Sequence, residues 1–113
     1  MEQLNKVELR GVVGSVRTNK VGALTLYDFS VATNCTYNDK GGIPVIETTW
    51  HHVQVWSDKL VGGAVERGDK VHVLGRIKMQ RYTDADGNDR TTYIIVSDKV
   101  KKLPDGALTM QSV

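Results

Sequence analysis

The most regular alternation in this chain is in Thr49-Trp50-His51-His52-Val53-Gln54-Val55-Trp56. Successive side chains of a β-strand point to opposite faces, so residues two apart share a face. Val53 and Val55 mark one face as the core side, and His51 shares it. The opposite, polar face then holds Trp50, His52, Gln54 and Trp56. Both tryptophans of the chain are therefore predicted to lie away from the core.

The same two-residue period predicts four further strands, and helical periodicity is nearly absent. These strands cover about residues 5–17, 24–33, 70–82 and 91–97. Gly11 and Gly14 inside the first strand predict a bend or bulge. Asp86-Gly87 predicts a hairpin turn between the last two strands.

The connections complete the predicted fold. Residues 34–47 are predicted to form a long polar loop or a floppy hairpin. Ser57-Asp58 offers a helix cap, which predicts a short helix over residues 59–66, and the tail after Leu103 is expected to fray. Five strands with one short helix between the third and fourth form the all-β layout of an OB-fold barrel. This pattern alone leaves SH3-like and other small barrels open.

Length and composition predict a single intracellular domain. The 113 residues, 40% of them hydrophobic and 25% charged, suit one globular domain of about residues 1–103 with a short tail at 104–113. The sequence shows no signal peptide and no apolar run of the ~20 residues that span a bilayer. The single cysteine, Cys35, suits a reducing compartment. We therefore expect a soluble protein with no membrane partner.

Basic residues gather on the fourth predicted strand. The net charge is only +2, but residues 70–81 hold four basic residues and no acidic one. We expect these cations and two on the first strand to contact phosphates: Lys70, Arg76, Lys78, Arg81, Lys6 and Arg10. Tyr82 ends the same strand.

Aromatic rings interleaved with cations on one face of a small barrel suit single-stranded nucleic acid. Unpaired bases stack on Trp or Tyr while Lys and Arg follow the phosphates, and stacking tolerates any sequence. Two alternatives remain open at this point. The tryptophan face is instead an interface with another protein or subunit, or the charged strand face is simply solvated.

Catalysis and metal binding have little support, so we expect no enzyme, metal or cofactor. His51 and His52 point to opposite faces and cannot hold one ion together. His52 and His72 can approach across neighbouring strands, but no acidic residue is apparent in register with them. The stretch Asp84–Asp89 resembles a calcium loop, yet its glycine is at the fourth place and its twelfth residue is Ile95.

Five fragments, in order over about residues 5–97, resemble the bacterial single-stranded DNA-binding protein family. They are Asn5-Lys6-Val7-x-Leu9-x-Gly11-x-Val13-Gly14, Phe29-Ser30-Val31-Ala32-Thr33, Thr49-Trp50-His51-His52-Val53, Gly68-Asp69-Lys70-Val71-x-Val73-x-Gly75-Arg76, and Tyr82-Thr83-Asp84-x-x-Gly87-x-Asp89-Arg90 followed by Ile94-Ile95-Val96.

The resemblance implies an OB-fold homo-oligomer, usually a tetramer, that binds single-stranded DNA in replication, recombination and repair. It implies base stacking by Tyr37, Trp50, Trp56 and Tyr82, of which Tyr37 comes from the resemblance alone. It also implies that His51 lies at a subunit interface. The implied location is the bacterial cytoplasm, in association with the nucleoid.

The tail departs from the family pattern. Members commonly end in a flexible linker and an acidic tip that recruits other proteins, whereas this sequence stops at Leu108-Thr109-Met110-Gln111-Ser112-Val113. We therefore expect no recruitment through the tail. The departure leaves open a primosomal replication protein-like OB dimer, or a mobile-element or phage-borne version of the binding protein.

Overall fold

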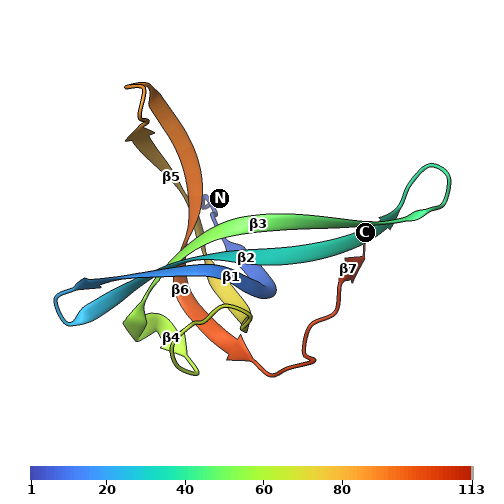
Figure 1. Ribbon diagram of the computed structural model, residues 1–113, viewed down its shortest axis with the longest axis horizontal. Helices are drawn as coiled ribbons and strands as arrows, with labels where there is room; N and C mark the ends of the chain where they lie inside the picture. The colour runs from blue at the N-terminus through green and yellow to red at the C-terminus, as the bar shows by residue number, and fades with distance from the viewer. Residues whose placement is uncertain (113) are drawn as a thin grey trace.

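The structure, a computed structural model, describes residues 1–112, and its regular elements are β-strands apart from one 3₁₀ turn (Figure 1). The long strands are β1 (Val7–Val21), β2 (Leu24–Asn38), β3 (Pro44–Trp56), β5 (Lys70–Thr83) and β6 (Asp89–Leu103). The short elements are the 3₁₀ turn η1 (Ser57–Lys59), β4 (Leu60–Val61) and β7 (Gln111–Ser112). Each predicted strand is present. The second, third and fifth predicted strands are several residues longer than predicted, whereas the first and fourth differ by only one to four residues at their ends.

The five long strands close into a barrel. Their order is β1-β5-β6-β3-β2, and β1 pairs with β2 as well as with β5. Residues 7–12 of β1 pair with β5 and residues 12–21 pair with β2, so this one strand joins the two ends of the sheet. The closed five-stranded barrel confirms the predicted OB-fold layout.

Closure requires glycine where β1 changes partner. The register between β1 and β2 shifts between Val13 and Val16, which confirms the predicted irregularity near Gly11 and Gly14. A Cβ atom at Gly11 would lie 2.3 Å from the backbone oxygen of Ala32. The two strands therefore approach more closely here than any other residue type allows.

The core is built mainly from valines on the inward faces of the strands. Phe29, Val31, Val53, Val55 and Val71 are at most 1% exposed, which confirms the inward face predicted for the third strand. The apolar alternation of β5, from Val71 to Met79, is buried only as far as Gly75. Ile77 and Met79 are 48% and 50% exposed, because β5 leaves the barrel there and continues with β6 as a two-stranded arm (Figure 1).

The predicted helix over residues 59–66 is wrong in extent. Only the single turn η1 forms, and β4 follows it directly. Gly62 and Gly63 have φ angles of 99° and 98°, a left-handed conformation that ends any right-handed helix. The loop still contributes to the core, because Val65 is only 3% exposed.

Two segments are more ordered than predicted. β2 and β3 stay paired to Asn38 and Pro44, and Asp39 Oδ1 accepts hydrogen bonds from the backbone of Gly41 and Ile43, so residues 34–47 form a defined hairpin. The tail runs back along the barrel, and β7 pairs in parallel with residues 35–36 of β2. Val113, the end of the predicted tail, lies outside the described residues. Within residues 1–112 no helix is long and apolar enough to cross a membrane.

We predict that Gly11→Ala lowers the free energy of unfolding by about 1–3 kcal/mol, because the added methyl group meets a backbone oxygen that cannot move aside. Urea unfolding followed by circular dichroism measures the change. Gly41→Ala is the matched control, since the nearest atom to its Cβ is 3.5 Å away. Equal stability of the two variants would contradict the role assigned to Gly11.

Candidate nucleic-acid interface

Both tryptophans lie exposed on the polar face of β3. Trp50 is 61% and Trp56 is 37% exposed, so both side chains reach the surface and Trp50 does so more fully. The two residues are six positions apart on one face, which separates them by about 20 Å along the strand. The predicted face of both tryptophans is thus confirmed, while their role in stacking stays a prediction.

A groove of about 380 Å³ lies beside Trp50. A Cβ atom at Gly14 would lie 2.7 Å from Trp50 Cζ3 and 2.6 Å from Ser30 Oγ. The indole can therefore extend toward Ser30, in the neighbouring row of paired residues, only because residue 14 has no side chain. The groove is lined by β1, β2 and β3 through Ser15, Arg17, Asp28, Phe29, Ser30, Trp50, His51 and His52.

An acidic side chain in this groove was missed in the sequence. Asp28 Oδ1 accepts a hydrogen bond from His52 Nε2, and Asp28 Oδ2 accepts one from Gln54 Nε2 at 3.1 Å. Asp28 pairs with Gln54 across β2 and β3, one row from His52. The expectation of no acidic residue near His52 is therefore wrong, because it was made without the register of these strands.

A second histidine has an acidic partner on the neighbouring strand. His72 Nε2 lies 2.6 Å from Glu8 Oε2, across the pairing of β5 with β1. The hydrogen bond from His72 lowers the pKa of Glu8 below its ordinary value. His52 and His72 are thus each bound to a carboxylate, and within residues 1–112 no three metal-ligating side chains are placed to hold an ion.

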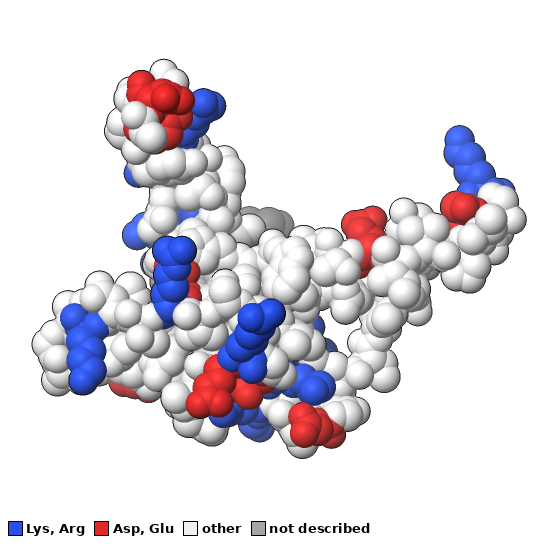
Figure 2. Space-filling view, in the orientation of Figure 1, with Lys and Arg blue, Asp and Glu red and all other residues white. Residues whose placement is uncertain are grey.

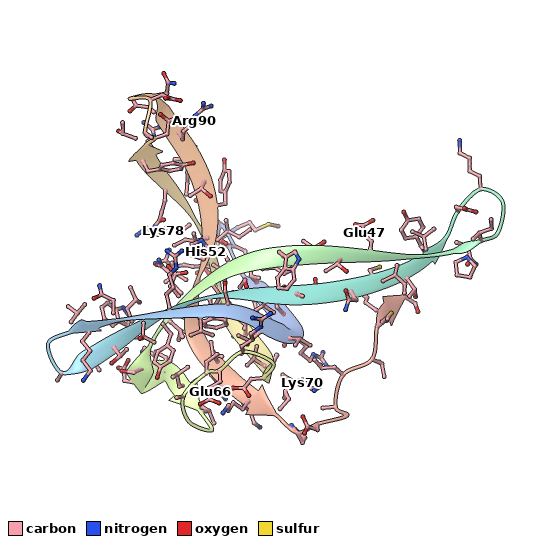
Figure 3. All side chains as sticks on the ribbon, viewed as in Figure 1. Glu47, His52, Glu66, Lys70, Lys78 and Arg90 are labelled. Atoms are coloured by element: carbon pink, nitrogen blue, oxygen red, sulfur yellow. The ribbon has the colours of Figure 1, made fainter. Side chains whose placement is uncertain are left out.

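The run of basic residues on β5 is divided by the structure. Lys70 lies at the barrel end of β5, far from Lys78 on the arm (Figure 3), and its Nζ atom is 3.3 Å from Asp105 Oδ1. Arg81 lies on the opposite face of the arm from Lys78, because their positions differ by an odd number. Arg76, Lys78 and Arg81 are exposed and form no ion pair within residues 1–112.

The other cations add to a dispersed pattern. Lys6 and Arg10 are exposed, and Arg10 lies opposite His72 in the backbone register of β1 and β5. Figure 2 shows Lys and Arg side chains spread over the arms and the barrel rather than gathered in one patch on this face. The structure therefore does not bring the six predicted phosphate contacts together.

The four predicted stacking residues occupy three places. Trp50 and Trp56 share the barrel face, Tyr37 lies on the β2–β3 hairpin and Tyr82 lies on the β5–β6 arm. The two hairpins project in different directions (Figure 1), and both tyrosines are exposed, by 38% and 52%. A single strand of nucleic acid that contacted all four side chains would follow a path around the barrel.

One exposed apolar cluster was missed in the sequence. Met79 pairs with Tyr93 across the arm, and Tyr93 is 64% exposed. Ile77 lies on the same face, two positions before Met79. The sequence did indicate that Tyr93 and Ile94, as successive strand residues, point to opposite faces. It did not indicate that β5 and β6 leave the barrel, which is what exposes the face of Tyr93.

His51 lies half-buried on the core side of β3. Its Nε2 atom is 2.8 Å from Thr33 Oγ1, and burial lowers the pKa of the imidazole below its ordinary value of 6.5. A second groove reaches His51 between the diverging ends of β1 and β2, beneath residues 107–111 of the tail. The role of His51 at a subunit interface stays a prediction.

Residues 4–103 match the model of the family described as "Single-strand binding protein family". The "Single-stranded DNA-binding protein" of Neisseria meningitidis serogroup B is 37% identical over 105 residues, which cover 88% of this chain and 60% of that protein. "Single-stranded DNA-binding protein 1" of Xylella fastidiosa is 32% identical over 109 residues, covering 91% of this chain and 79% of that protein. The chain thus spans about 60% of the length of the Neisseria relative.

A solved structure described as "Plasmodium falciparum SSB complex with ssDNA" shares the fold. Its TM-score is 0.76 at 22% sequence identity, and the match covers 92% of this chain and 98% of that one. The fold similarity therefore extends over most of this chain.

We predict that His51 makes folding less stable as the pH falls below 6.5. Because burial lowers the pKa of His51, the unfolded chain takes up this proton more readily than the folded one. The contribution is present above pH 6.5 and is lost as the pH falls toward the folded pKa. Urea unfolding of the native protein and His51→Gln over this range tests it.

The variant should show a shallower loss of stability between pH 6.5 and 5. Glu8 and Asp84 also have lowered pKa values, but they change the stability only near and below their ordinary pKa values of 4.5 and 3.8, outside this pH range. Identical pH profiles for the two proteins would contradict the role of His51.

Proposed function

This chain belongs to the single-strand binding protein family, and we propose that it binds single-stranded DNA with little dependence on sequence. The observation that carries the proposal is the exposure of Trp50 and Trp56 on one polar barrel face beside a groove. Relatives that cover most of this chain are named as single-stranded DNA-binding proteins. By this account it acts in bacterial DNA replication, recombination and repair, in the cytoplasm and at the nucleoid.

Binding by this surface would combine stacking with charge neutralisation. Each base stacked on an aromatic ring contributes about 1–3 kcal/mol, and duplex DNA hides the base faces that Trp50 and Trp56 would contact. Tyr37 and Tyr82 extend the path onto the two hairpins. Arg76, Lys78 and Arg81 are free to meet phosphates along the arm, with Lys6 and Arg10 at the barrel. Lys70 is the weakest of the proposed contacts because Asp105 already pairs with it.

We further propose a homo-oligomer, a tetramer with a dimer as the alternative. His51 supports this proposal, because it is polar, half-buried and reached by a groove. A primosomal replication protein-like dimer would use the same barrel with two copies.

The exposed cluster of Ile77, Met79 and Tyr93 favours a second candidate function. An apolar patch on a projecting arm is typical of a protein-interaction surface. A protein-interaction OB domain would use this patch or the tryptophan face to hold another chain. The two candidates differ in whether nucleic acid reaches Trp50 and Trp56.

We predict that poly(dT) quenches tryptophan fluorescence, since the chain has no tryptophan other than these two. Trp50→Ala and Trp56→Ala should each weaken binding by about 1–3 kcal/mol while leaving the circular dichroism spectrum unchanged. Tyr93→Ala, which removes an exposed ring outside the face, is the matched control. Absence of quenching at low salt would exclude the proposed function, and unfolding of Trp56→Ala would show that Trp56 is structural.

We also predict that the affinity falls with salt by a log–log slope of about −0.7 for each phosphate neutralised. Arg76→Ala and Lys78→Ala should each flatten this slope by less than about one unit. Lys70→Ala should change it less, because Asp105 already offsets that charge. A larger effect at Lys70 than at Lys78 would contradict the proposed path along the arm.

A further inference from the structure

A carboxylate occupies the middle of the proposed DNA-binding face. Asp28 lies on β2 in the row of Gln54, between the rows of Trp50 and Trp56. A negative charge repels phosphates, so its position is unexpected for a surface that only follows the DNA backbone. A carboxylate is, however, a strong acceptor for the donor groups of bases.

The carboxylate is held in a fixed orientation with acceptor capacity to spare. His52 Nε2 binds Oδ1 and Gln54 Nε2 binds Oδ2, one bond for each oxygen. A carboxylate has about four lone-pair sites, so about two remain. The side chain is 34% exposed and lines the groove, which leaves these sites open to a ligand.

A base stacked on Trp50 would bring its edge toward this carboxylate. The indole reaches the row of Ser30, as the contact with Gly14 shows. Asp28 is the next residue on the same face of β2, about 7 Å further along the strand. A single planar base can bridge that span, with Arg17 and the Ser15 and Ser30 hydroxyl groups around it.

The bases differ in what they offer to a carboxylate. Cytosine, adenine and guanine each carry an exocyclic amino group that donates, whereas thymine and uracil carry a carbonyl oxygen at the position of the cytosine amino group. An oxygen placed against the Asp28 carboxylate meets a second acceptor and gains nothing.

We propose that this groove is a nucleobase subsite, in which Asp28 accepts a hydrogen bond from the amino group of a base stacked on Trp50. The subsite adds a base preference to a surface whose stacking is otherwise indifferent to sequence. It rests on the proposed binding of single-stranded DNA. His52 and Gln54 are positioning residues that hold the carboxylate toward the ligand.

The test compares oligomers of deoxycytidine and deoxyuridine of equal length, at a pH above 7 where cytosine is neutral. These pyrimidines have the same size and differ mainly in the amino or carbonyl group. The measured quantity is the ratio of their affinities, by tryptophan quenching, for the native protein, Asp28→Asn and Asp28→Glu. Asp98→Asn is the control, because it makes the same charge change at an exposed residue whose side chain forms no ion pair within residues 1–112.

The ratio should favour deoxycytidine by about threefold to tenfold more in the native protein than in Asp28→Asn, because the amide can donate to uracil. Asp28→Glu keeps the charge but moves the oxygens, so the ratio should fall there too, and Asp98→Asn should keep the native ratio. If Asp28→Asn changes both affinities equally, Asp28 acts through charge alone and the subsite is wrong. If the native protein binds neither oligomer, the proposed function itself fails.

Discussion

The whole barrel depends on β1 being hydrogen-bonded on both of its edges. Its first half completes the sheet next to β5 and its second half pairs with β2, so one continuous strand has to turn sharply between two neighbours. At Gly11 this turn brings β1 very close to β2. A Cβ atom on Gly11 would lie only 2.3 Å from the backbone oxygen of Ala32. Without this close approach the five strands would form an open sheet with two exposed edges.

The path of β1 also determines what lies beside the exposed tryptophans of β3. Because β1 crosses β2 at a shifted register, Gly14 comes to lie beneath the indole of Trp50 and Arg17 beside Asp28. The groove therefore draws its residues from β1, β2 and β3, which pair with one another in chain order. Beyond the barrel, β5 and β6 continue as a free arm (Figure 1), which carries Tyr82 and the unpaired cations away from that groove.

The sequence was sufficient where the signal is local. The alternation around Val53 and Val55 identified both the core side and the exposed tryptophans, and Asp86-Gly87 located a hairpin whose Gly87 has a φ of 81°. It was insufficient where the answer depends on pairing between distant strands. Asp28 meets His52 through the register of β2 with β3, 24 positions apart in the chain, and no local period reports that register.

Strand ends were also beyond local reasoning. Ile77 and Met79 continue the apolar alternation of β5, yet they are exposed because β1 stops pairing with β5 at Gly75. The tail could not be placed for a similar reason, since the partner of β7 is the free edge of β2 at residues 35–36. In both cases the missing information was which strand lies alongside.

The central claim is that Trp50 and Trp56 together form the surface that meets single-stranded DNA. The chain has two tryptophans, so a ¹H–¹⁵N spectrum shows two side-chain indole resonances, one for each ring. Both indole resonances should shift on titration with oligo(dT). Binding that leaves both indole resonances in place and shifts the resonances around Ile77, Met79 and Tyr93 instead would contradict it.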